Sequence, residues 1–455
     1  MAANPQAGVT LRPVPPETPA LRRSLGLVRA TAMVVGIIIG ASIFVQPSLI
    51  TAQVPTAGGI YAVWLVAGAL TLAGALVCAE LASAFPRSGG VYAFLREAYG
   101  PQAGFLWGWA MFWSVHTGIA AAIAMIFARY AAELVPLGDA GQRLTAIGAV
   151  LALSAVNYVG VRLGSAVQTA LTIAKVGAVA ALAVVLLLVG DAGAPAAAAV
   201  AGTPLTARGF LLALVAGLFA FGGWHMVAYA AEETREPETT IPRALLVGTL
   251  VVTACYIALN AAYLHVLPVE RLITSPAVAA DAADAVLGSG GRTVTAVLVV
   301  VSTLGALGGV VLAGPRLYYA MARDGLLFSA LADVHPRYQT PHRAVALQAA
   351  WATVLVATNT YGALFRRVVY TEWLFFGLMA LSLVWLRRRA EYRPAYRAPL
   401  VPVLPVLFAL ASGAIVVNEV LREPRRSAVG LAIVLSGLPV YWAWRRYAAA
   451  RRIPA

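Results

Sequence analysis

Lysine is almost absent from this chain of 455 residues, because Lys175 is the only lysine among its 33 basic residues. Cysteine is nearly as scarce, and both copies, Cys78 and Cys255, fall in apolar stretches. A small secreted scaffold held by disulfides is therefore excluded. The sequence also has no phosphate-binding loop, no HExxH motif and no Cys/His cluster with metal-ligand spacing. We therefore expect no enzymatic activity, no cofactor and no bound metal.

Charge is also sparse, since charged residues make up 11% of the chain, hydrophobic residues 61%, and the mean hydropathy is +0.81. This composition is typical of a protein that lies in a bilayer, where each helical span needs about 20 apolar residues. No charge occurs between Arg29 and Glu80, which leaves room for two spans. Further low-charge windows lie at about 98–128, 144–161, 163–190, 209–231, 244–269, 293–315, 344–365, 368–386, 398–421 and 427–444. We expect an all-α integral membrane protein with about twelve transmembrane helices.

Two of the expected spans contain residues that weaken a helix. The first span reads VVGIIIGASIFVQPSLI, with Gly36, Gly40 and Ser42 among its isoleucines. The sixth is interrupted by the pair Gly222 and Gly223 in FAFGGW. The two interruptions are five spans apart, as an inverted repeat of five plus five helices with broken helices 1 and 6 would place them. The alternative for each interruption is that small residues only allow close helix packing.

The repeat predicts how the chain is divided. We expect a disordered cytoplasmic tail without a cleaved signal peptide over residues 1–28. The first repeat would cover 29–190 and the second 207–390. Two additional spans over 398–447 and a cytoplasmic tail over 448–455 complete the organisation.

A broken helix inside a membrane offers a binding site made of backbone. The freed N–H and C=O groups must find partners in protein or in a polar cavity. N–H groups at the start of the second half-helix favour a carboxylate, which the helix dipole also attracts. Freed carbonyl oxygens favour an ammonium group. A zwitterionic amino acid carries both groups, so the breaks indicate an amino acid site.

Four ordered stretches also resemble a known family. They are GIIIGASIFV, ELASAFPRSGGVYAFLREAYGPQAGFLWGW, FAFGGW followed by EETREPETTIPRAL, and ARDGLLFSALADVHPRYQTPHRA. Together they resemble the amino acid-polyamine-organocation superfamily, and within it the L-type amino acid transporter group, from about residue 25 to 400. The resemblance implies the five-plus-five repeat with two extra helices (a LeuT-like fold). It also implies sodium-independent amino acid transport, often by exchange.

Carried onto this sequence, the resemblance implies a set of substrate-binding residues: Ile38, Gly40, Ala41, Ser42, Ile43, Phe219, Gly222 and Gly223. Backbone at 40–42 would bind the carboxylate, and the carbonyls of Ile38 and Phe219 the amine. Phe219 would also be the gate that closes over the substrate, and Gly222 would shape the side-chain pocket. Relatives usually have glycine where this chain has Ser42, so the approach is more crowded or gains a hydroxyl donor. Phe219 could instead be a packed or lipid-facing aromatic.

Lys175 lies inside the expected fifth span. In the sodium-independent families that this chain resembles, a lysine in this span supplies the charge that sodium supplies elsewhere. Lys175 would then tether the carbonyls between Gly36 and Gly40, and whether it also carries a proton stays open. The alternative is a lysine that snorkels to the headgroups.

Other polar residues inside the expected spans have open roles. His116 and His225 either line the pathway or are neutral histidines bonded to backbone. Ser302 and Thr303 in the eighth span are candidate hydroxyls near the fifth. We expect three carboxylates at span ends to pair with loop arginines: Glu80, Glu232 and Glu233.

Arginines are concentrated in the tails and loops on the N-terminal side, so we expect both termini to be cytoplasmic in the plasma membrane. The net charge of +14 then reflects contact with lipid headgroups rather than nucleic acid. Animal relatives with a disulfide-linked accessory subunit carry a cysteine in the loop after the third span, where residues 131–145 have none. We expect no such partner, and a monomer or weak homodimer.

These observations predict sodium-independent transport of neutral L-amino acids by alternating access, with exchange as the expected mode. No Asp or Glu is evident in the middle of the first, third, sixth or eighth span to hold a cationic substrate side chain. Two alternatives stay open. One is proton-coupled uptake of amino acids or amines, and the other is a membrane amino acid sensor that does not transport.

Overall fold

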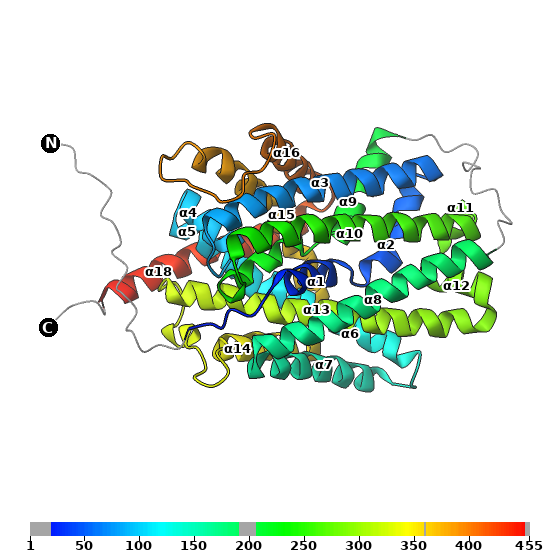
Figure 1. Cartoon of the computed structure of the whole chain (residues 1–455), viewed down its shortest axis with the longest axis horizontal. Coiled ribbons are helices and arrows are strands. Elements are labelled where there is room, and N and C mark those ends of the chain that lie inside the picture. The colour runs from blue at the N-terminus through cyan, green and yellow to red at the C-terminus, as the bar shows by residue number, and fades with distance from the viewer. Residues whose placement is uncertain (1–19, 191–205, 359–360, 451–455) are drawn as a thin grey trace.

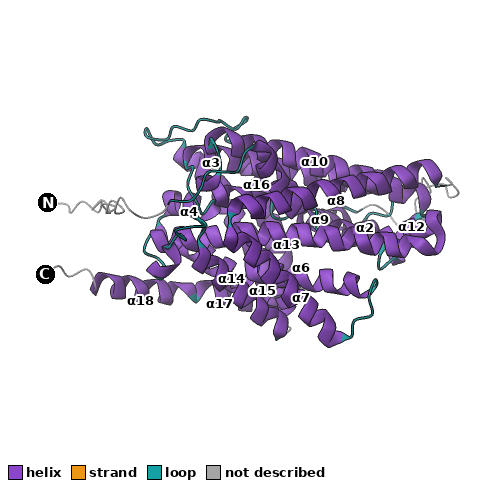
Figure 2. Cartoon of the chain, turned by 60° about the horizontal axis from the view of Figure 1, so that its bottom comes forward, coloured by secondary structure: helices purple, strands orange, loops and turns teal. Residues whose placement is uncertain are grey.

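The computed structural model describes residues 20–190, 206–358 and 361–450. Regular structure in these ranges is helical, apart from one isolated parallel bridge between Leu25 and Thr234. The long helices run side by side along one direction (Figure 1), and the view coloured by secondary structure contains helices and loops (Figure 2). The predicted all-helical fold is confirmed.

The helices of the first half of the chain follow one another in the order predicted from the apolar windows. They are α1 (Leu27–Ile38), α2 (Ser42–Gln53), α3 (Ala57–Ala84), α4 (Val91–Tyr99), α5 (Pro101–Ala110), the π-helical turn η1 (Met111–Val115), α6 (His116–Ala132), α7 (Asp139–Val159) and α8 (Val161–Val189).

The second half begins with a helix that is interrupted like the first span. Its elements are α9 (Ala207–Ala220), the 3₁₀ helix η2 (Trp224–Glu233), α10 (Pro237–Val266), α11 (Val269–Thr274), α12 (Val278–Leu287), η3 (Gly288–Gly290), α13 (Gly291–Arg323), η4 (Ser329–Ala332), α14 (His342–Ala357), α15 (Tyr361–Leu386), α16 (Val403–Arg422), α17 (Pro424–Leu435) and α18 (Gly437–Ala450).

Nine helices or helix runs in the described residues are long and apolar enough to cross a membrane, and the bent pair α1 and α2 makes ten. They are Ala57–Ala84, Pro101–Ala132, Val161–Val189, Ala207–Glu233, Pro237–Val266, Val278–Arg323, Val368–Leu386, Val403–Arg422 and Pro424–Tyr447. Helices α7 and α14 lie where the fourth and ninth spans are expected, but they are not among these ten. The chain is a multi-pass membrane protein, and the count of twelve and the inverted repeat stay predictions.

Both predicted helix breaks are present. Helices α1 and α2 are separated by residues 39–41 and are bent by 48°. The second break is a turn over residues 221–223 between α9 and η2, where Gly223 has a φ of +95°. L-residues with a side chain rarely adopt this φ, so glycine allows the turn.

Helix α13 is central, and the last helices are peripheral. In its most apolar stretch, the run Val278–Arg323 has 78% of its residues buried, against 22% for Val403–Arg422. Helix α13 packs against α1, α6 and α8. Helix α1, which ends at the first break, is therefore supported by the most enclosed part of the bundle.

The end of the bundle drawn at the left in Figure 1 is held together by ion pairs. The buried Glu80 carboxylate accepts from Arg387, and Ser24 and Leu25 donate backbone hydrogen bonds to the Glu233 carbonyl at 2.8 and 2.9 Å. The last residues of the predicted N-terminal tail are thus docked, while residues 1–19 lie outside the described part. The carboxylates Glu80, Glu232 and Glu233 pair with arginines as expected, although the partner of Glu233, Arg316, lies within α13 rather than in a loop.

Candidate functional site

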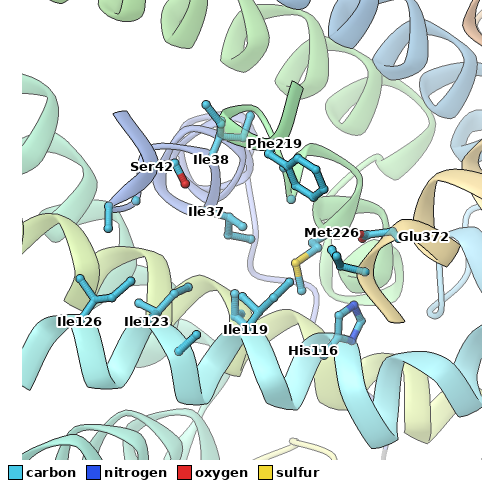
Figure 3. A pocket seen from close by; sticks show the side chains of 18 of the residues that line it. Ile37, Ile38, Ser42, His116, Ile119, Ile123, Ile126, Phe219, Met226 and Glu372 are labelled. Atoms are coloured by element: carbon cyan, nitrogen blue, oxygen red, sulfur yellow. The ribbon is translucent and has the colours of Figure 1, made fainter. Parts of the chain in front are cut away.

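A cavity of about 210 Å³ lies between the two helix breaks. Figure 3 shows side chains from α1, α6, α9 and α15 around it. Its volume is below the roughly 300–1,000 Å³ of cavities that take drug-sized ligands. The cavity lining includes most of the residues named from the sequence: Ile38, Gly40, Ala41, Ser42, His116, Phe219, Gly222, Gly223 and His225.

Four of the named residues do not line this cavity. Ile43 is fully buried in α2, and the Thr303 hydroxyl donates to the Val299 carbonyl at 2.7 Å within α13. Ser302 and Lys175 lie behind the first break instead. The structure therefore separates the named residues into a group that faces the cavity and a group that supports its wall.

The Lys175 side chain is fully buried and holds the first break from behind. Its Nζ donates to the Gly36 carbonyl at 2.9 Å, to the Ile39 carbonyl at 2.7 Å and to the Ser302 carbonyl at 2.7 Å. Three acceptors match the three donors of an ammonium group. The side chain therefore connects α8 to the end of α1 and to α13, and it does not reach toward the headgroups.

Ser302 completes the support of the break from α13. Its hydroxyl lies 3.1 Å from the carbonyl oxygens of both Ile39 and Gly40. Two consecutive carbonyl groups that the helix has released are thus paired with protein groups. This agrees with the requirement that non-helical backbone in a membrane finds partners in protein.

The two carbonyl groups predicted to bind an amine already have one protein partner or more. The Ile38 oxygen accepts from the Gly40 N–H at 2.8 Å, and the Phe219 oxygen accepts from the Gly222 N–H at 3.1 Å. The buried Tyr256 hydroxyl lies 3.1 Å from the Ile38 oxygen and 2.9 Å from the Ala220 oxygen. This tyrosine of α10, which the sequence analysis did not name, links the two broken helices.

The start of α2 offers N–H groups to the cavity. Ala41 precedes the helix and makes no side-chain capping hydrogen bond, and it lines the cavity together with Ser42. The first N–H groups of any α-helix lack a partner within the helix. Such a helix start is suited to a carboxylate.

A carboxylate that the sequence analysis missed also lines the cavity. Glu372 lies in α15, and its Oε1 is 3.8 Å from His225 Nε2. In the described residues, neither ring nitrogen of His225 or of His116 has a hydrogen-bond partner. The signal for Glu372 was its place in the apolar window 368–386, because a carboxylate inside a membrane span is costly and rarely without a role.

The broken helices, the enclosed cavity and the membrane-spanning bundle define a membrane transport protein. Comparisons with known proteins give its family. Residues 25–439 match the model of the amino acid permease family, and the chain belongs to that family. The fold and the family together exclude an enzyme and make the chain an amino acid transporter.

Several relatives are similar along almost their whole length. The serine/threonine exchanger SteT of Bacillus subtilis (strain 168) is 33% identical over 434 residues, which cover 94% of this chain and 98% of that protein. The human b(0,+)-type amino acid transporter 1 is 33% identical over 441 residues, covering 95% and 90%. The human cystine/glutamate transporter is 30% identical over 431 residues, covering 93% and 85%. The resemblance described from four sequence motifs is confirmed.

Proposed function

We propose that the chain exchanges neutral L-amino acids across the plasma membrane by alternating access and without sodium. The observation that carries this proposal is the Lys175 ammonium group bonded to the carbonyls of Gly36, Ile39 and Ser302. A fixed cation already satisfies the carbonyl groups of the opened backbone at this point. A sodium ion is then not needed to stabilise the break.

The substrate's main-chain atoms would bind between the two breaks. Its carboxylate would accept from N–H groups at the start of α2, near Ala41 and Ser42, and its ammonium would face the carbonyls of Ile38 and Phe219. The Phe219 ring would close over the bound substrate as the gate. We therefore propose these backbone groups as the amino acid site.

A neutral side chain fits the rest of the cavity, which is mostly apolar. Ile119, Ile123, Ile126 and Met226 line it on the side of α6 and η2 (Figure 3). Glu372 adds one hydrogen-bond acceptor to this wall. Serine and threonine, which name the Bacillus relative, are the first substrates to test because their hydroxyl can donate to such an acceptor.

The proposal is tested in liposomes that contain the purified chain. Labelled serine should enter liposomes preloaded with unlabelled serine or alanine, at the same rate in sodium and in choline medium. Liposomes that are not preloaded with an amino acid should take up little labelled serine. A requirement for sodium would overturn the proposal, and binding without accumulation would identify a sensor.

The pair of His225 and Glu372 favours one second candidate, which is proton-coupled uptake. Their side chains are 1% and 12% exposed and face each other at 3.8 Å in the cavity wall. A histidine and a carboxylate at this distance can share or release a proton as the substrate binds. Accumulation in empty liposomes under an inward proton gradient, lost in Glu372→Gln, would support this candidate over exchange.

We also propose that both termini are cytoplasmic and that no accessory subunit is disulfide-linked. Cys78 is buried in α3 and Cys255 is half-buried in α10, so both lie within helices of the bundle. Protease digestion of sealed vesicles tests the orientation. Electrophoresis without reductant tests the absence of a linked partner, and the same gel with a crosslinker tests for a weak homodimer.

A further inference from the structure

Five arginines meet at the end of the bundle where α1, α8 and α10 begin. They come from three separate parts of the chain and line one hollow: Arg22, Arg23, Arg29, Arg162 and Arg235. We call them the arginine cluster. A neighbouring hollow shares Arg22, Arg29 and Arg162 and adds Arg337 from the loop before α14. The sequence does not predict that these arginines lie together, because their positions depend on how the three helices pack.

Within the part of the chain that the structure describes, the arginine cluster has no acidic partner. In the described ranges, none of the five forms an ion pair with a carboxylate, and Arg29 donates to the Ser165 hydroxyl at 3.2 Å. Glu236 and Glu238 follow Arg235 in sequence but line neither hollow. Six arginines outside the cluster behave differently, since Arg87, Arg96, Arg316, Arg323, Arg343 and Arg387 each pair with a carboxylate. Five unpaired guanidinium groups in one hollow favour an anion.

An apolar groove continues from the arginine cluster along the bundle. Leu27 and Val28 line both the hollow and this groove, which lies between α1, α8 and α10. The groove has a volume of about 570 Å³. Its apolar walls include Ile173 and Val247, whose side chains are 65% and 43% exposed. A ligand that fits both parts must be anionic at one end and apolar along the other.

We propose that the arginine cluster and the apolar groove together bind one anionic glycerophospholipid. The lipid phosphate and the oxygen atoms of its headgroup would accept from the guanidinium groups, and one acyl chain would lie in the groove. Basic pockets between spans are suited to anionic headgroups. A lipid with a choline headgroup would place a cation beside five unpaired arginines, so it should bind more weakly.

The proposed lipid site is formed by the same helices that carry the first break and Lys175. The groove is formed by α1, which carries the first break, and by α8, which carries Lys175. A lipid that contacts α1, α8 and α10 at once stabilises the arrangement of these three helices seen here. The lipid site does not depend on which amino acid is transported or on the coupling mode.

The test compares lipids on the purified full chain in detergent. Native mass spectrometry and thermal unfolding are measured with phosphatidylglycerol, phosphatidylcholine, glycerol phosphate and inorganic phosphate. We expect phosphatidylglycerol to remain bound and to raise the unfolding temperature, with about tenfold weaker binding of phosphatidylcholine. Equal binding of the two lipids would overturn the proposal. Equal stabilisation by glycerol phosphate or phosphate would also overturn it, because it would identify a site for a free anion.

Two sets of variants separate the headgroup site from the groove. Arg22→Gln/Arg29→Gln/Arg162→Gln should weaken phosphatidylglycerol binding at least tenfold. Its control, Arg388→Gln/Arg393→Gln/Arg397→Gln, removes the same charge from three other exposed arginines and should leave binding unchanged. Equal effects of the two would refute a specific site. If the first variant does not fold, the single variants Arg22→Gln and Arg162→Gln should each weaken binding about threefold, and no effect of either would refute the site.

A substitution in the apolar groove gives a second, independent test of acyl-chain binding. Gly177 lines the groove, and a Cβ at this residue would meet no atom within 4 Å. Gly177→Phe should therefore be tolerated and fill the groove, so that binding of phosphatidylglycerol falls. Gly413→Phe, at a glycine of α16 that is equally open, is the control. Unchanged lipid binding in Gly177→Phe would show that no acyl chain lies in the groove.

Discussion

Glu233 and Arg316 form a two-point ion pair that is completely buried. The guanidinium Nε and Nη2 donate to the two carboxylate oxygens at 2.8 and 2.9 Å, and both side chains are 0% exposed. The pair joins η2, the second half of the sixth span, to α13. Because an unpaired charge at this depth is very unfavourable, each side chain needs the other.

Glu233→Gln should therefore destabilise the protein by about 3–5 kcal/mol, as expected when one partner of a buried pair is removed. Glu232→Gln is the control, because Glu232 pairs with Arg323 near the surface, where an ion pair contributes about 0–1 kcal/mol. Thermal unfolding in detergent measures both. Equal stability of the two variants would show that the buried pair contributes no more than the exposed one.

Gly305→Ala should impair transport by displacing Lys175. A Cβ at Gly305 would lie 2.7 Å from Lys175 Cε and 2.8 Å from Nζ, so the ammonium would have to leave its three carbonyl partners. A buried carbonyl group that loses its hydrogen-bond partner destabilises the folded protein by about 1–3 kcal/mol. Uptake of labelled serine into preloaded liposomes is expected to fall at least tenfold.

Gly413→Ala is the matched control for this change, since a Cβ there would meet no atom. Lys175→Ala should reproduce the loss seen in Gly305→Ala. Wild-type uptake by a well-folded Lys175→Ala protein would remove the proposed role of the ammonium.

At the second break, Gly223 should tolerate substitution less well than its neighbour Gly222. Gly223 has a φ of +95°, and a Cβ there would lie 2.4 Å from Ile37 Cγ2. The left-handed backbone alone costs an L-residue about 1–2 kcal/mol. Gly223→Ala should thus lower both the unfolding temperature and transport.

Gly222→Ala should be tolerated better, because its Cβ would lie 3.3 Å from the Phe219 carbonyl oxygen and its φ lies outside the left-handed region. Expression level, unfolding temperature and uptake are compared for the two variants. A Gly222→Ala protein that is less stable than Gly223→Ala would contradict this order.

Phe219→Ala should reduce transport more than stability, because a gate acts mainly when the cavity closes. Phe219 lines the cavity and is only partly buried, so its loss removes little core packing. Leu211→Ala is the control on the same helix, since Leu211 is 55% exposed and lies outside the cavity lining. Normal uptake by a well-expressed Phe219→Ala protein would exclude a gating role.

The positions of the two helix breaks could be predicted from the sequence because glycine and serine act locally, on the backbone that carries them. The sequence placed Lys175 inside a span, but burial and snorkelling to the headgroups both remained open until the packing of α8 was known. The contribution of Glu372 and Tyr256 could not be predicted in this way, since it depends on how α15 and α10 are rotated against other helices. The same limit explains why Ile43, one residue after Ser42, is buried in α2 and lies outside the cavity lining.

The isolation of Lys175 makes this chain suited to spectroscopy. The printed sequence contains a single ε-amino group, which is fully buried among three carbonyl oxygens. Growth on ¹⁵N-labelled lysine would introduce one labelled side chain, so its NMR signal needs no assignment by mutation. Its chemical shift and proton exchange would report directly on the backbone of the first break as substrate is added. Amine-reactive reagents would meanwhile leave this group unmodified until the bundle opens.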